Sequence, residues 1–98
     1  MASVRNLKKD IDLVMSLALS DCFYVMEYNP KVNEEAVYKI AGEIVQKHRE
    51  LRLRAMHPDG KDNPKLVKKY YQGLVQDMLA AADSALEGLS AEVKKTVK

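Results

Sequence analysis

Apolar residues recur along this chain in three long segments, with the three- and four-residue spacing of α-helices. The first segment covers residues 4–28, and its apolar positions surround most of the helix circumference. The centre of its apolar face is formed by Leu7, Ile11, Val14, Met15, Ala18, Cys22 and Val25. Its continuous polar strip consists of Arg5, Lys9, Asp12, Ser16, Ser20 and Glu27. A helix with so little polar surface needs neighbours on several sides.

The second segment carries clear signals at both helix ends. Asn33 is expected to cap a helix over residues 34–57, and Pro58 is expected to end it. Two glutamates in the first turn complement the helix dipole. The predicted core face of this helix is Val37, Ile40, Ala41, Ile44, His48, Leu51 and Ala55.

The third segment begins with Asn63 as the cap and Pro64 at the first helical position, where a missing N–H costs nothing. Gly88 is the expected C-terminal cap, which bounds the helix at residues 64–87. The lysine-rich tail over residues 90–98 either adds a weak further turn or frays. The predicted core face is Val67, Tyr71, Leu74, Met78, Ala81, Ala82, Ala85 and Leu89.

No segment shows the alternation of a β-strand, and 98 residues make one domain. Three helices joined by short loops predict an all-α, antiparallel up-down-up three-helix bundle over residues 1–89. This topology places the start of the first helix, the end of the second and the start of the third at one end. Eleven lysine and arginine residues gather there with five carboxylates, although the whole chain carries a net charge of only +2. We therefore expect an electrically polarised bundle.

The sequence predicts a cytoplasmic protein without a membrane segment. The lone Cys22 has no intrachain disulfide partner. Asp10 and Asp12 interrupt the apolar run near the N-terminus, so this run does not match a signal peptide. No apolar run approaches the roughly 20 residues that are needed to cross a bilayer.

Three polar residues fall on or beside the apolar faces and are candidates for an internal site. Asp21 lies in the apolar arc of the first helix, His48 in the middle of the second helix's apolar face, and Arg52 at its edge. Together they suggest either an acid/base pair or a satisfied buried pair, Asp21 with His48 or Arg52. The buried pair is favoured, because a buried charge must find a partner. No serine or cysteine has the spacing of a nucleophile beside them, so a hydrolase is not suggested. No metal site, cofactor or small-molecule substrate is indicated, and we expect no enzymatic activity.

The sharpest short motif is His57-Pro58-Asp59, which follows HRELRLRAM and precedes KKYYQGL. This region, residues 47–75, resembles the HPD region of J-domains. The resemblance implies that the tripeptide contacts a heat-shock ATPase chaperone. By the same resemblance Arg49, Arg52 and Arg54 would steer this contact. Lys65, Lys68 and Lys69 are further candidates for binding a partner. The long first helix lacks the tyrosine-leucine motif of J-domains, and the alternative is that Pro58 ends a helix and Asp59-Gly60 makes a turn.

Three features are spread over the whole chain: NLKKDIDLVMSLALSDCF near the start, a His-Pro turn after the second helix, and a Pro-Lys start to a Tyr-Tyr helix. In these features the chain resembles small helical proteins of unknown function from Bacteroides-type bacteria. This resemblance implies no activity or site.

Leu13, Leu17 and Tyr24 are expected to remain outside the core, because two partner helices do not easily cover so wide an apolar arc. We therefore predict a non-enzymatic interaction or scaffold protein that forms a homodimer through this helix or binds another protein. A tail that folds back with Val93 and Val97 over the same residues is the intramolecular alternative. Weak nucleic-acid binding at the basic end is a less favoured alternative, because acidic residues alternate there with the basic ones.

Overall fold

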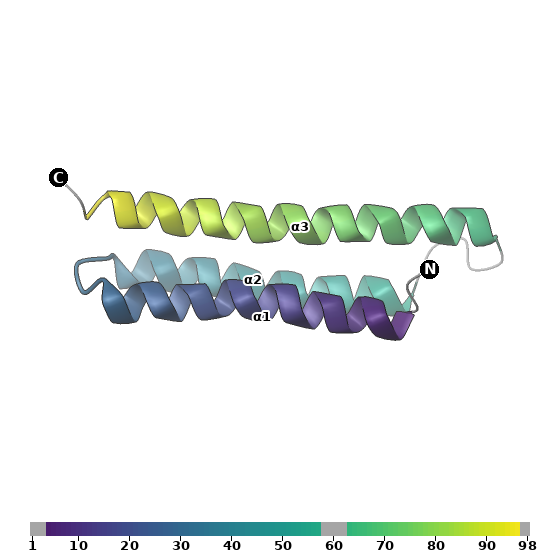
Figure 1. Cartoon of the computed structure of the whole chain (residues 1–98), viewed down its shortest axis with the longest axis horizontal. Coiled ribbons are helices and arrows are strands. Elements are labelled where there is room, and N and C mark those ends of the chain that lie inside the picture. Colours follow the sequence, from purple (N-terminus) through teal and green to yellow (C-terminus); the bar gives the residue numbers. More distant parts are fainter. Residues whose placement is uncertain (1–3, 58–62, 97–98) are drawn as a thin grey trace.

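The predicted helical segments form three α-helices in the computed structural model, which describes residues 4–57 and 63–96 (Figure 1). α1 spans Val4–Tyr28, α2 spans Glu34–Met56 and α3 spans Pro64–Lys94. Successive helices run in opposite directions, each helix packs against both others, and neither described stretch contains a strand. The all-α, up-down-up three-helix bundle is thereby confirmed. The molecule is elongated, with dimensions of 55 × 20 × 19 Å.

The helices begin where the sequence predicts, because polar side chains satisfy the first backbone N–H groups. The Asn33 side chain accepts a hydrogen bond from the Ala36 N–H at 3.3 Å. The Asn63 side chain accepts from the N–H groups of Lys65 at 3.0 Å and Leu66 at 3.4 Å. At its other end α2 stops one residue before the predicted boundary, and His57 serves as its C-cap.

A single core runs between the three helices, and the predicted apolar faces form it. Its fully buried side chains come from all three helices and include Ile11, Met15, Val37, Leu51 and Leu74. Val14, Val25, Ile40 and Tyr71 lie at its edge, partly buried. The buried residues and the partly buried residues that pack against them leave one side of each helix exposed.

The end of α3 differs from the prediction. Gly88 does not cap this helix, which continues to Lys94, about two turns beyond the predicted end at residue 87. A Cβ atom at Gly88 would lie 3.2 Å from Cδ1 of Ile40 in α2. The glycine therefore permits a close approach of two helices, and Leu89, which is buried one residue later, shows that this part of α3 belongs to the core.

Candidate functional site

The polar contact between α1 and α2 involves a different carboxylate from the one predicted. Nε2 of His48 lies 2.6 Å from Oδ1 of Asp12, and Nε of Arg52 lies 3.6 Å from the same oxygen. Asp21 is exposed and forms no ion pair with any described residue, so its prediction as a buried partner is wrong.

The antiparallel register of α1 and α2 explains this correction. Because His48 stands at the level of Asp12, Asp21 lies nine residues further along α1, about 13 Å away along the helix axis. The helical wheel assigns Asp12 to the polar strip of α1. In the structure its side chain lies beside α2 and contacts that helix. The side chains of His48, Asp12 and Arg52 are all partly exposed, so they form a groove contact and not a buried pair.

The basic residues at the end of α2 differ in their exposure. Arg49, Arg52 and His57 are exposed, and Arg52 also contacts Asp12 of α1. Arg54 is less exposed, and its Nη1 lies 2.9 Å from Oδ2 of Asp77 in α3. The Arg54 guanidinium also lies 5.9 Å from the ring centroid of Tyr70. Burial alone would lower the pKa of Arg54, but its hydrogen bonds to Asp77 and Tyr70 outweigh that effect and raise the pKa. Arg54 thus links α2 to α3.

The same end of the bundle has a second link that sequence analysis did not identify. The Tyr71 hydroxyl donates a hydrogen bond to the Ala55 carbonyl at 3.2 Å. Ala55 is in the last turn of α2, where carbonyl groups have no partner within the helix. A tyrosine facing a helix C-terminus has no distinctive sequence signal, because the pairing depends on how α2 and α3 are aligned.

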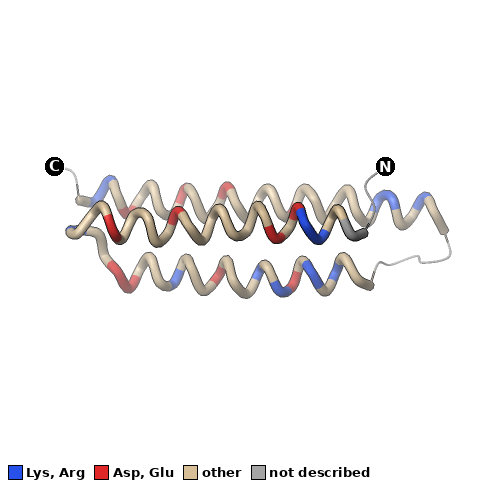
Figure 2. The backbone as a smooth tube through the Cα atoms, turned by 60° about the horizontal axis from the view of Figure 1, so that its bottom comes forward, with Lys and Arg blue, Asp and Glu red and all other residues tan. Residues whose placement is uncertain are grey.

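Beyond these two links, α3 extends past the other helices (Figures 1 and 2). Lys65, Lys68 and Lys69 lie exposed on its first turns. Pro58 and Asp59 of the HPD motif lie outside the described residues, so only His57 of the motif is placed. The structure therefore brings three helix termini and several exposed cations to one end.

The outward side of α1 carries an apolar strip, which we call the outer face of α1: Leu13, Leu17, Tyr24 and Tyr28. These side chains are 59%, 57%, 61% and 65% exposed, respectively. The rings of Tyr24 and Tyr28 contact each other, with centroids 4.5 Å apart. Tyr28 was not assigned to this surface from the sequence, although its i+4 spacing from Tyr24 indicates the shared face.

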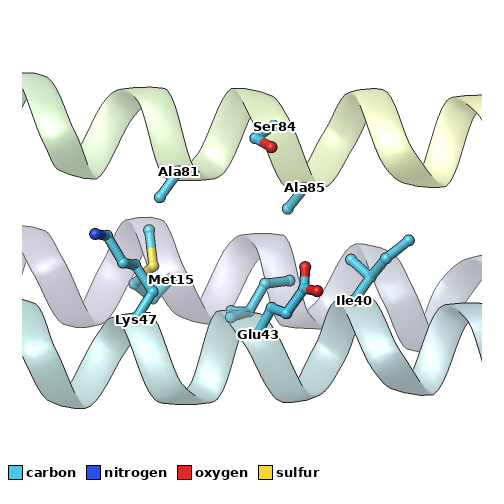
Figure 3. Close-up of a pocket in the computed structure, with 8 residues that line it drawn as sticks. Met15, Ile40, Glu43, Lys47, Ala81, Ser84 and Ala85 are labelled. Atoms are coloured by element: carbon cyan, nitrogen blue, oxygen red, sulfur yellow. The ribbon is translucent and has the colours of Figure 1, made fainter.

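Two hollows on the described surface do not resemble a ligand site. One hollow, of about 150 Å³, lies between α2 and α3 (Figure 3). Its α3 side is lined by Ala81, Ser84 and Ala85. Glu43 and Lys47 of α2 lie opposite, and Met15 of α1 lies behind them. This volume is below the roughly 300–1,000 Å³ of small-molecule pockets. The other, of about 420 Å³, is lined by α2 residues alone, above Gly42, and is a surface depression.

Reactive groups do not converge on either hollow. Cys22 is fully buried, and burial together with the neighbouring Asp21 charge raises the pKa of its thiol. Among the described residues, no group of three or more His, Cys, Asp and Glu side chains has an arrangement that would hold a metal ion.

None of the described helices combines the length and apolar character needed to traverse a membrane.

Comparison with known proteins assigns neither a family nor a function to the chain. The chain matches no protein-family model, no curated protein and no solved structure. Both resemblances noted in the sequence therefore remain predictions.

Proposed function

We propose that this protein is a non-enzymatic interaction protein that associates with a second copy of itself through the outer face of α1. The observation that supports this proposal is the exposure of four large apolar side chains on one face of a single helix. The opposite face of α1 supplies Ile11, Met15, Ala18 and Cys22 to the core. α1 is therefore apolar both inward and outward, which a helix at the surface of a monomer does not require.

Association would remove these side chains from water. Burying a leucine side chain contributes about 1.5–3 kcal/mol, and a two-fold contact buries each residue twice. Tyrosine suits such a surface, because its ring supplies apolar area while its hydroxyl remains hydrated at the rim.

The intramolecular alternative does not cover the outer face of α1. Residues 90–94 continue α3 as a helix, and Val93 is partly buried along it. Leu13, Leu17 and Tyr24 are exposed in the same structure, so the described part of the tail is not folded over them. Val97 lies outside the described residues.

Substitution of Leu17 tests this proposal. Leu17→Ser is expected to raise the dimer dissociation constant at least about tenfold, because two apolar contacts are lost per dimer. The measurement is sedimentation equilibrium over a range of protein concentrations. The matched control is Leu79→Ser, which changes a leucine of similar exposure, 51%, on α3 and should leave the constant unchanged.

Either of two results would contradict the proposal. The unsubstituted protein could sediment as a monomer at all concentrations, or Leu79→Ser could weaken the dimer as much as Leu17→Ser. A circular dichroism spectrum of each variant separates loss of association from loss of folding.

A J-domain-like cochaperone is the second candidate. It is favoured by the exposure of His57 at the end of α2, with Arg49 and Arg52 exposed on the turns before it. The test is stimulation of a heat-shock ATPase chaperone by the intact protein and its loss in His57→Gln. Stimulation that persists in His57→Gln, or that is absent from the unsubstituted protein, would exclude this candidate.

A further inference from the structure

A second set of exposed apolar side chains lies along α2, on the side that borders α1. Val45 and Tyr38 precede Arg52 by seven and fourteen residues, which is close to two and four helical turns. They therefore share the side of α2 on which Arg52 contacts Asp12 of α1. Tyr38 is 57% exposed and Val45 is 46% exposed. Large apolar side chains of α2 thus remain in water beside α1.

Phe23 adds an aromatic side chain from α1. It follows Asp12 by eleven residues, close to three turns, so it lies on the side of α1 that borders α2. Because Asp12 stands at the height of His48, Phe23 stands at the height of Val37, next to Tyr38. Phe23 is 52% exposed. We call the surface that these apolar side chains form along the two helices the α1–α2 face: Phe23, Tyr38 and Val45.

Cations gather along the same two helices at the other end of this face. Arg49 precedes Arg52 by one turn, and Lys9 precedes Asp12 by one turn; both cations are exposed. Asp12 already contacts Arg52. Neither Arg49 nor Lys9 forms an ion pair with any described residue. Three cations therefore accompany one carboxylate, and the fourteen residues between Tyr38 and Arg52 place them about 21 Å from the aromatic side chains.

The aromatic end of the α1–α2 face lies beside carboxylates instead. Glu34 precedes Tyr38 by one turn, and Glu27 follows Phe23 by one turn; both are exposed and outnumber Lys31 in the connection between the helices. A nucleic acid or an anionic lipid surface is negative throughout, so it would meet these carboxylates as well as the cations. A helix of a protein can carry apolar side chains at one end and carboxylates at the other. The order of charges therefore favours a protein helix.

We propose that the α1–α2 face binds an amphipathic helix of another protein. The large apolar side chains of that helix contact Phe23, Tyr38 and Val45. Its carboxylates lie up to about four turns away, where they face Arg49 and Lys9. This surface is separate from the outer face of α1, because Tyr24 follows Phe23 directly and lies about 100° around the helix from it.

Two synthetic peptides of about 18 residues test the order of apolar and charged groups. Both are alanine-rich helices with leucines at helical spacing in one half. The other half carries glutamates in one peptide and lysines in the second. At about 50 mM sodium chloride the glutamate peptide is expected to bind at least about tenfold more tightly than the lysine peptide. Fluorescence anisotropy of labelled peptides measures both affinities.

Substitutions in the protein locate the binding surface. Tyr38→Ser is expected to weaken binding of the glutamate peptide at least about tenfold, because an aromatic contact is lost. The matched control, Tyr24→Ser, changes a tyrosine of similar exposure on the outer face of α1 and should leave this affinity unchanged. Arg49→Glu should reduce the preference for the glutamate peptide several-fold. Lys68→Glu makes the same change of charge on α3 and should preserve the preference.

Several results would overturn the inference. These are a glutamate peptide that does not bind at about 1 mM, equal affinities of the two peptides, or equal losses in Tyr38→Ser and Tyr24→Ser. Displacement of the glutamate peptide by duplex DNA or by phosphatidylserine vesicles would identify a different class of partner. Weaker self-association of Tyr38→Ser in sedimentation equilibrium would identify a second copy as the occupant of the α1–α2 face. If Tyr38→Ser leaves self-association unchanged, the proposed dimer and this inference stand or fall separately.

Discussion

At the residue scale, the contact of Asp12 with His48 and Arg52 shows that two polar side chains on neighbouring helices pair only where they stand at the same height along the helix axis. Asp21 has the more apolar neighbours on the helical wheel, yet Asp12 is the carboxylate that stands opposite His48. An aspartate has a short side chain, so it can reach a partner only at its own level. Position along α1 therefore decides the pairing more than position around it.

Asp12→Asn is expected to lower the free energy of unfolding by about 0.5–1.5 kcal/mol, because it removes the carboxylate that contacts both His48 and Arg52. The effect is modest because the three side chains are partly exposed. The matched control, Asp21→Asn, should change the free energy by less than about 0.5 kcal/mol. Urea denaturation at one fixed protein concentration measures both. A larger loss at Asp21 than at Asp12 would show that the pairing is wrong.

At the element scale, the length of α3 depends on what it contacts and not only on its own residues. A glycine followed by a polar segment is the usual signal for a helix end. Here Ile40 of α2 packs at the level of Gly88, and the buried Leu89 anchors the following turns. Packing against α2 and α1 thus carries the helix through a residue that would otherwise favour its end.

Substitution of glycines within helices should give different results at Gly73 and Gly88. Gly73→Ala is expected to stabilise the protein by about 0.5–1 kcal/mol, because no atom lies within 4 Å of the new methyl group and alanine favours the helix. Gly88→Ala should gain less, because Ile40 must shift to make room. Gly88→Val should destabilise the protein by about 1–3 kcal/mol through overpacking. Thermal denaturation of the three variants measures this order, and equal gains at Gly73 and Gly88 would contradict a close helix approach.

At the scale of the whole molecule, three helices share one core, so access to any buried group requires the bundle to open. Cys22 reports on this opening, because it is fully buried in α1 and is the only cysteine in the chain. Its raised pKa also reduces the fraction of reactive thiolate in the folded protein at a given pH.

At pH 8, Cys22 should react with a thiol reagent at least about 1,000-fold more slowly in the folded protein than in urea. The control is Ser90→Cys, which places a second thiol at an exposed position on α3 and should give one fast and one slow reaction. Two fast reactions would show that the end of α1 opens locally without unfolding of the whole bundle.

Much of the fold follows from periodicity alone. The apolar spacing identified each helix, and Asn33, Asn63 and Pro64 located two of their starts, because capping is a local interaction between residues two or three apart. The exposure of Leu13, Leu17 and Tyr24 also agrees with the sequence argument, since a helix in a three-helix bundle has only two neighbours.

By itself the sequence determined the number, type and starts of the helices, their apolar faces, and the gathering of lysine and arginine residues at one end. These properties depend on residues close together in the chain or on the up-down-up order of the helices. Only the tertiary structure decided that Asp12 meets His48, that Arg54 bonds Asp77, and that α3 continues past Gly88. Each of these depends on the sliding and rotation of one helix against another. Those alignments arise from the packing of many side chains at once, so no local pattern specifies them.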